Sequence, residues 1–127
     1  MINHVGDVTG KPVGFKAVIG DKTWLGEFLA AVNKRGKEFA PDFITVDSAD
    51  GGTGAAPMSL LDYVGMPIHE SIPLAIDSIC KAELLDRIKV IASGKLINHA
   101  EFDRALCVGA DFITSARGFM FSLGGIQ

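Results

Sequence analysis

The chain has 127 residues, of which 48% are hydrophobic and 21% charged, and its formal net charge is −3 at pH 7. This length predicts one domain rather than a two-domain enzyme. No surplus of Lys or Arg is present for phosphate backbones, and no apolar stretch approaches the ~20 residues that cross a bilayer, so neither nucleic acid nor membrane is expected as a partner. The amino terminus lacks the features of a secretory signal, which favours a cytoplasmic protein.

Four short runs rich in Val, Ile and Phe are predicted to be strands, each followed by residues at helical spacing. They cover residues 13–19, 43–46, 88–92 and 112–114. Because the runs are continuously apolar, we expect parallel strands that are buried on both faces. The sequence Asp-Phe-Ile-Thr at 42–45 recurs at 111–114, which predicts the same helix-to-strand junction twice.

Helical segments are expected between these strands. The first carries apolar residues from Trp24 and should stop at Gly36. The second has its apolar face from Ile68 onward, and Pro73 is tolerable there only if the helix starts late. Asn98, with a glutamate three residues on, indicates a capping-box start for the third. The last helix is expected to be short or absent.

Parallel β/α units form either an open doubly wound sheet or a closed eightfold barrel, and a complete barrel needs ~250 residues. The sequence therefore predicts an α/β fold that is half of a (β/α)8 TIM barrel, with about four parallel β/α units in one partial domain over residues 1–127. A half barrel leaves unpaired first and last strands, so we expect a homo-oligomer, most simply a dimer that closes the barrel edges. The alternative is an open four-stranded sheet with a flavodoxin-like outline.

In such folds, function collects in the loops at the carboxyl ends of the strands. A Gly-rich loop at 47–57 follows the second strand. Its glycines would let the backbone approach a ligand closely, and successive backbone N–H groups could form an anion-binding nest. The alternative is that the loop is a flexible connector. Neither a dinucleotide fingerprint nor a P-loop is present. Residues 93–95 (Ser-Gly-Lys) and 115–118 (Ser-Ala-Arg-Gly) resemble a two-loop phosphate grip; otherwise they are tight turns with solvated basic side chains.

Other polar residues are weaker candidates. Lys16 lies in an apolar strand and is either an inward cation for an anionic ligand or a strand-end lysine in solvent. The three histidines have no metal-ligand spacing, so we expect no metal site. Cys80 and Cys107 lie in helical patterns and are predicted to be buried, reduced thiols.

Several motifs together resemble a known family. These are ITVDSADGGTGAAP, VGMP, IKVIASGK, ALCVGADFITSARGFMF and LGGIQ. From about Lys11 onward the chain resembles the FMN-binding synthase domain of the glutamate synthase (large subunit) family, and would supply barrel strands five to eight. The resemblance implies FMN as the cofactor and the reduction of 2-iminoglutarate to glutamate, with ammonia from glutamine and electrons from a pyridine nucleotide or ferredoxin.

The resemblance also implies residue roles. Lys16 corresponds to a catalytic lysine near flavin and substrate. The remaining residues would bind the cofactor, first in the loop over the active site (Ser48, Asp50, Gly51, Gly52 and Thr53) and then at the FMN phosphate (Ser93, Gly94, Lys95, Ala116 and Arg117).

Departures from the family pattern limit this expectation. Similar proteins have a cysteine at the position of Gly125, the first of three cluster ligands, so no iron–sulfur cluster is expected; the glutaminase domain and the first barrel half are also lacking. Ser48 stands where glycine is commoner. We therefore expect a partial FMN-binding domain that is inactive alone. The alternatives are a non-enzymatic, self-associating half-barrel that has lost flavin, and a fragment that binds another phosphorylated metabolite.

Overall fold

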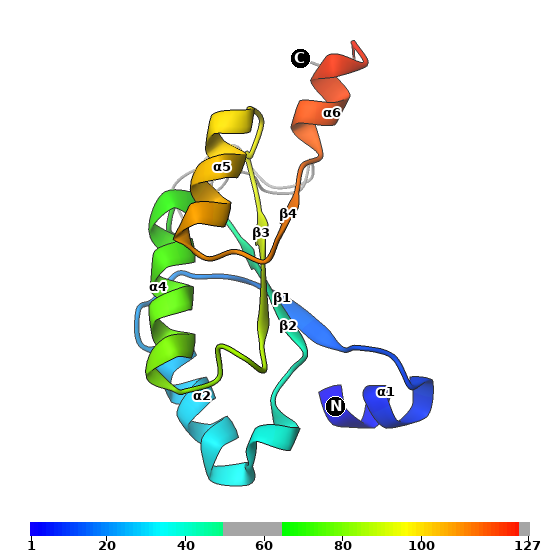
Figure 1. The fold of residues 1–127 in the computed structure, drawn as a ribbon, viewed down its shortest axis with the longest axis vertical. Coiled ribbons are helices and arrows are strands. Elements are labelled where there is room, and N and C mark those ends of the chain that lie inside the picture. Colours follow the sequence, from blue (N-terminus) through cyan, green and yellow to red (C-terminus); the bar gives the residue numbers. More distant parts are fainter. Residues whose placement is uncertain (50–64, 125–127) are drawn as a thin grey trace.

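The computed structural model describes residues 1–49 and 65–124 of the chain (Figure 1). In chain order, the elements are α1 (Ile2–Thr9), β1 (Gly14–Val18), α2 (Trp24–Arg35), the 3-10 helix η1 (Lys37–Phe39), β2 (Phe43–Asp47), α4 (Ile68–Lys81), β3 (Lys89–Ser93), α5 (His99–Val108), β4 (Phe112–Thr114) and α6 (Arg117–Ser122). All four predicted strands are therefore confirmed, with ends that differ by a residue or so. Among the described residues, no helix is long and apolar enough to cross a membrane.

The four strands form one parallel sheet in the order β1-β2-β3-β4. This confirms the α/β class and the four parallel strands. Among the described strands the order does not reverse, whereas a doubly wound sheet reverses at its switch point, so a flavodoxin-like outline does not fit. The other part of that alternative, an open four-stranded sheet, is not contradicted. The half-barrel itself stays a prediction.

Helices α2, α4 and α5 form one layer on a single face of the sheet (Figure 1). Beneath this layer, the side chains of the two central strands are at most 2% exposed: Ile44, Val46, Val90 and Ala92. The helices contribute Leu25, Leu29, Ile72, Ala75 and Ile79 to the same core. Each fully buried Val, Leu or Ile side chain in this core stabilises the fold by roughly 1.5–3 kcal/mol.

The opposite face of the sheet is called the open face here. Strand alternation and register assign it Gly14, Lys16, Val18, Phe43, Thr45, Asp47, Lys89, Ile91, Ser93, Phe112 and Thr114. None of these residues is buried, and Val18 is 45% and Phe112 59% exposed. The prediction that the strands are buried on both faces is therefore wrong for the described residues, because the helical layer covers one face only.

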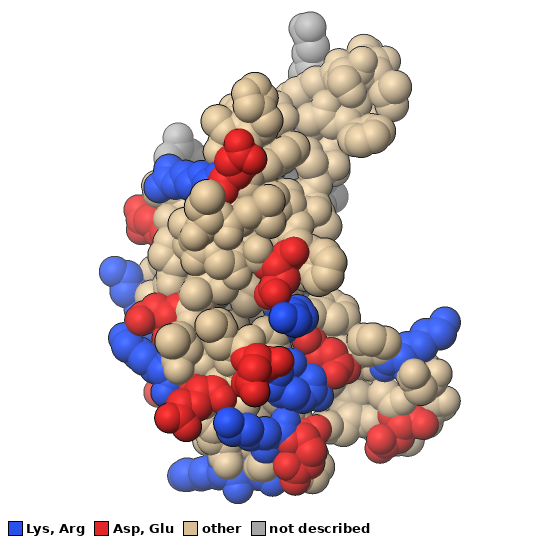
Figure 2. All heavy atoms as spheres, in the orientation of Figure 1, with Lys and Arg blue, Asp and Glu red and all other residues tan. Residues whose placement is uncertain are grey.

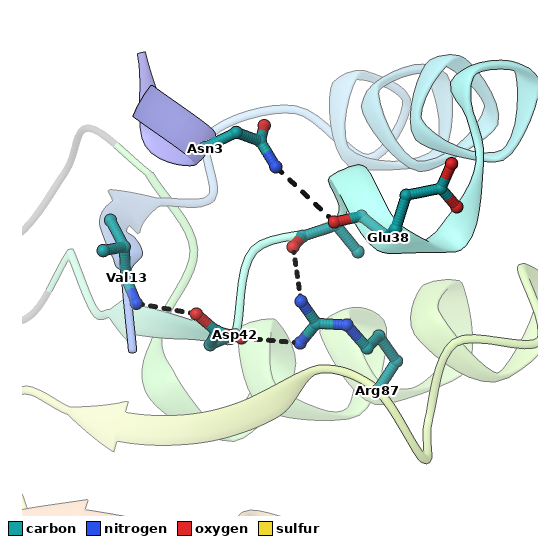
Figure 3. A network of polar contacts seen from close by, with 6 residues as sticks. Asn3, Val13, Glu38, Asp42 and Arg87 are labelled. Atoms are coloured by element: carbon teal, nitrogen blue, oxygen red, sulfur yellow. Dashed lines mark hydrogen bonds and ion pairs between the residues drawn. The ribbon is translucent and has the colours of Figure 1, made fainter. Parts of the chain in front are cut away.

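Asp42 ties together the amino ends of β1 and β2 (Figure 3). Its Oδ2 accepts the backbone N–H of Val13 at 2.7 Å, and its Oδ1 lies 2.7 Å from Nη1 of Arg87. Nη2 of Arg87 donates to the carbonyl of Ala40 at 3.1 Å. The Val13 N–H, and to a smaller extent Arg87, hold the pKa of Asp42 below its usual range despite partial burial.

Asp111 repeats this junction at the amino ends of β3 and β4. Its Oδ2 accepts the N–H of Val90 at 2.9 Å, and its Oδ1 lies 3.0 Å from Nζ of Lys89. Burial alone raises the pKa of Asp111, but these two donors outweigh it and hold that pKa below the usual value. The duplicated Asp-Phe-Ile-Thr sequence thus marks two equivalent junctions, as predicted.

Helix α4 begins at Ile68, so Pro73 lies inside it and the expected late start is wrong. Pro73 has no N–H to donate to the preceding turn. The early start buries Ile72 to 3% exposure, and Pro73 itself faces solvent, so apolar burial offsets the lost hydrogen bond. The short last helix is confirmed by α6, which has six residues.

The two cysteines are also placed differently from expectation. Both thiols are free, as predicted, but Cys80 of α4 and Cys107 of α5 are exposed rather than buried. Cys80 comes directly after the buried Ile79, and Cys107 comes two residues after the buried Ala105. At these helical positions both cysteine side chains turn away from the core. The helical spacing around the two cysteines is confirmed, but both cysteines lie on the exposed face of their helices and not on the buried one.

Candidate functional site

The parallel strands bring their carboxyl ends to one end of the sheet, where most of the predicted site residues lie. Lys16 projects from the open face of β1, and its Nζ lies 2.6 Å from Oδ2 of Asp47, the last residue of β2. The lysine side chain is 61% exposed and the aspartate side chain 14%. Lys16 thus lies in the middle of β1 on the open face, with most of its side chain in contact with solvent, and its reading as an inward cation stays a prediction. The sequence did not single out Asp47 as a site residue. Its position at the end of a predicted strand is the feature that could have indicated it.

Ser48 and Gly94 join the ends of β2 and β3. Ser48 is 2% exposed, and its N–H donates to the carbonyl of Ser93 at 3.0 Å. A Cβ on Gly94 would lie 2.4 Å from Oγ of Ser48, and Gly94 has a φ of +108°. Only glycine accommodates both the conformation and this close approach. The side chain of Ser48 therefore occupies the space that a side chain at position 94 would need.

The loops after β3 and β4 are hydrogen-bonded to each other. Oγ1 of Thr114 donates to the carbonyl of Ala92 at 3.3 Å, and Oγ of Ser115 donates to the carbonyl of Leu96 at 2.7 Å. A Cβ on Gly118 would lie 2.8 Å from the carbonyl oxygen of Ile97, so this second glycine also permits close packing. The two halves of the predicted phosphate grip are therefore neighbours.

Two cationic residues flank this junction. Lys95 follows Gly94 and has a φ of +24°, an uncommon conformation for a residue with a side chain. Arg117 is half-buried at the first position of α6, and the preceding residue, Ala116, provides no side-chain cap for that helix. The junction thus combines Ser93, backbone N–H groups and two cations, a donor set suited to an anion with several oxygens.

The predicted cofactor residues Asp50, Gly51, Gly52 and Thr53 lie outside the described residues. The residues that flank this segment are described. Ala49 donates its N–H to the carbonyl of Met66 at 3.1 Å, and Met66 donates to that of Ile19 at 2.8 Å. Ala49 and Met66, the described residues near this gap, therefore lie at the carboxyl ends of β2 and β1.

A separate hollow of about 370 Å³ lies at the amino end of the open face. Its lining residues are Pro12, Asp42, Phe43, Arg87, Lys89, Ile91 and Phe112. The charged groups here belong to the two aspartate junctions, and Phe43, Ile91 and Phe112 make its floor apolar. This hollow was not predicted and is distinct from the polar carboxyl end. No cluster of three His, Cys, Asp or Glu side chains suited to a metal occurs among the described residues.

Comparison with known proteins gives a consistent assignment. Residues 3–127 match the family model described as the conserved region in glutamate synthase. The glutamate synthase large subunit-like protein YerD of Bacillus subtilis is 43% identical over 126 residues, which are 99% of this chain and 24% of that protein. The archaeal glutamate synthase (NADPH) of Methanocaldococcus jannaschii is 35% identical over 83 residues, 65% of this chain and 16% of that protein.

The chain thus spans about a quarter or less of the length of these relatives. A solved structure of a cobalamin-binding protein from Desulfitobacterium hafniense is also similar, with a TM-score of 0.42 and 16% identity over 86% of this chain and 55% of that one. A similarity of that size says nothing about the ligand of this chain.

Proposed function

The chain belongs to the family defined by the conserved region in glutamate synthase, and on that premise we propose that it is the FMN-binding part of a glutamate-synthase-type oxidoreductase. In the complete enzyme the reaction would be the reduction of 2-iminoglutarate to glutamate. The 127-residue chain contributes cofactor and substrate contacts to that reaction and is not active alone.

The observation that carries this proposal is the hydrogen bond of 2.7 Å from Ser115 to the carbonyl of Leu96. It holds the loop after β3 against the loop after β4. Ser93, Gly94 and Lys95 therefore share one end of the sheet with Ala116 and Arg117. Paired loops after the last two strands of a β/α barrel are a common phosphate site.

The residues present fit the phosphate of FMN. Lys95 and Arg117 supply positive charge, Ser93 supplies a hydroxyl, and the backbone N–H groups of the loops complete the donor set. Gly94 and Gly118 allow the two loops to pack without a Cβ between them. When bound, the flavin would supply the redox chemistry, and the protein would hold and orient it.

Lys16 is proposed to face the anionic edge of the flavin or a substrate carboxylate. Lys16 projects from the open face, and its ammonium pairs at 2.6 Å with Asp47, the last residue of β2. Asp50, Gly51, Gly52 and Thr53 lie outside the described residues, and only the resemblance assigns them to the same active site.

The consecutive strand order and the single helical layer support the assignment of this sheet to strands five to eight of a (β/α)8 barrel. A barrel keeps its helices outside and its ligand sites at the carboxyl ends of its strands. Both features agree with the position of Lys16, Ser93 and Arg117.

The experiment is a titration of FMN with the purified chain, followed by flavin fluorescence, with riboflavin in parallel. Riboflavin lacks the phosphate, so Arg117→Ala should weaken FMN binding about tenfold to a hundredfold, as expected for a charge-assisted hydrogen bond of ~1.5–3 kcal/mol, and leave riboflavin binding unchanged. Arg104→Ala, in the exposed part of α5, is the matched control.

Three results would count against the proposal. Equal losses for FMN and riboflavin would place Arg117 away from the phosphate. Binding of inorganic phosphate without binding of flavin would favour another phosphorylated metabolite. Absence of any binding would leave a non-enzymatic half-barrel.

A further inference from the structure

The ion pair between Lys16 and Asp47 differs in position from the other ion pairs that the described residues make on the sheet. The junctions of Asp42 and Asp111 bring their cations to the amino ends of the strands. On the side of the molecule shown in Figure 2, most Lys, Arg, Asp and Glu side chains likewise lie away from α6. Asp47 is instead the last residue of β2, so its ion pair lies toward the carboxyl ends of the strands, where ligand sites of β/α barrels are found.

The strand register explains how the two side chains meet. Lys16 is the partner of Thr45 in the sheet and Asp47 is the partner of Val18, so Lys16 and Asp47 are diagonal neighbours on the open face. The lysine has the much longer side chain, so it covers most of this diagonal and points toward the carboxyl end of β1. The contact of 2.6 Å between Nζ and Oδ2 therefore fixes the direction of the lysine side chain.

Asp47 is the rigid partner of this pair. Its side chain is 14% exposed, and the next residue, Ser48, is 2% exposed and donates its N–H to the carbonyl of Ser93 at 3.0 Å. Lys16 has a flexible four-carbon stem and a side chain that is 61% exposed. Without a partner, such an ammonium would sample many positions, because the rotamer freedom of a lysine in solvent is large.

We propose that Asp47 is a positioning residue, which holds the ammonium of Lys16 in the orientation that meets the ligand and does not itself contact the ligand. An ammonium has three N–H donors, and one suffices for Asp47. The 61% exposure of the lysine side chain leaves the other donors accessible to an anionic or acceptor group. This inference rests on the role of Lys16 in the proposed function, and it gives Asp47 an effect that acts through Lys16 alone.

The first experiment measures the positioning itself, without flavin. Nuclear magnetic relaxation of the lysine ammonium nitrogens in the purified protein reports how restricted each ammonium is. Lys16 should be more restricted than the exposed Lys34 of α2, and Asp47→Asn should reduce it to the level of Lys34. Asp47→Glu retains a carboxylate and should keep most of the restriction. The matched control is Asp77→Asn, which breaks the 2.6 Å pair with Lys81 on α4 and should mobilise Lys81 but not Lys16.

The second experiment tests whether this positioning matters for the ligand. The dissociation constants of riboflavin and FMN are measured by titration, as is that of 2-oxoglutarate, the oxo analogue of 2-iminoglutarate, on the FMN-loaded protein. Lys16→Met identifies the ligand that Lys16 faces by weakening its binding. Asp47→Asn should weaken the binding of that same ligand about fivefold, the scale of an exposed ion pair, and Asp47→Glu should restore most of it. In the Lys16→Met background, Asp47→Asn should have no further effect, because no ammonium remains to be positioned.

The outcomes separate this inference from the proposed function. If none of these ligands binds, or if Lys16→Met weakens none of them, the proposed role of Lys16 is wrong and that of Asp47 is wrong with it. If Lys16→Met weakens binding and Asp47→Asn does not, the role of Lys16 stands and the positioning role is wrong. Additive losses in the double variant would also overturn the inference, because Asp47 would then contact the ligand or act on the fold. The same holds for an ammonium of Lys16 that is equally mobile in the wild type and in Asp47→Asn.

Discussion

Nζ of Lys16 lies 2.6 Å from Oδ2 of Asp47, across the strand pair β1–β2, although the lysine side chain is 61% exposed. An ion pair this exposed contributes at most ~1 kcal/mol to stability. Lys16→Met should therefore change the free energy of unfolding by less than that amount in urea denaturation, as should the control Lys34→Met on α2. A loss of several kcal/mol for Lys16→Met alone would show that the lysine is structural and would weaken its proposed role toward a ligand.

Asp42 predicts an acid-sensitive part of the stability. Its pKa in the folded chain is lowered, first by the Val13 N–H and then by Arg87, from an unfolded value of about 3.9. The stabilisation is therefore present above that unfolded value and is lost as the pH falls through the lower folded value. Asp42→Asn should be less stable at neutral pH and should lose less stability on acidification than the wild type.

Thermal unfolding from pH 6 to pH 2 measures this difference, with Asp103→Asn on the exposed side of α5 as the control. We expect Asp42→Asn to reduce the pH dependence of the stability without abolishing it, because Asp111 also has a lowered pKa. Parallel pH curves for Asp42→Asn and the wild type would contradict the assignment.

Gly94 predicts a position that tolerates no side chain. An added Cβ would lie 2.4 Å from Oγ of Ser48, and the φ of +108° is strained for any other residue. Gly94→Ala should cost more than about 1 kcal/mol in the free energy of unfolding. Adding Ser48→Gly should restore part of the loss by removing the contact, since the strain in φ remains. Gly20→Ala, where nothing lies within 4 Å, is the control, and an equal loss there would refute the argument.

The exposed thiols predict rapid chemical labelling. Cys80 and Cys107 are both free and exposed, so both should react with a thiol-specific disulfide reagent in the native state, without denaturant. Single Cys→Ser variants assign each reaction. Labelling that requires unfolding would show that the thiols are buried, as the sequence pattern had suggested.

Local sequence signals predicted the elements of this fold well. The Asn98–Glu101 capping box forms as expected, with Asn98 accepting the N–H of Glu101 at 3.0 Å. The repeated Asp-Phe-Ile-Thr sequence correctly indicated equivalent junctions at Asp42 and Asp111. Both signals act over a few residues, so the linear pattern contains nearly all the information needed.

Features that depend on distant partners were harder to predict. Helix α1 has no buried residue, and its clearest signal is Gly10, which ends it with a φ of +64°. Its Asn3 amide makes a long contact of 3.5 Å with the carbonyl of Glu38, 35 residues away (Figure 3). Likewise, nothing near Lys16 in the chain indicates Asp47, and only the strand register brings these two together.

The order of the strands has a consequence for how the chain acquires its structure. Among the described strands, each one after β1 pairs with the strand that precedes it, so each of these β/α units meets, as it emerges during synthesis, an edge already formed by the unit before it. None of the four described strands has to insert between two others, as the central strands of a doubly wound sheet do. The fold can therefore grow from β1 to β4 in the direction of translation.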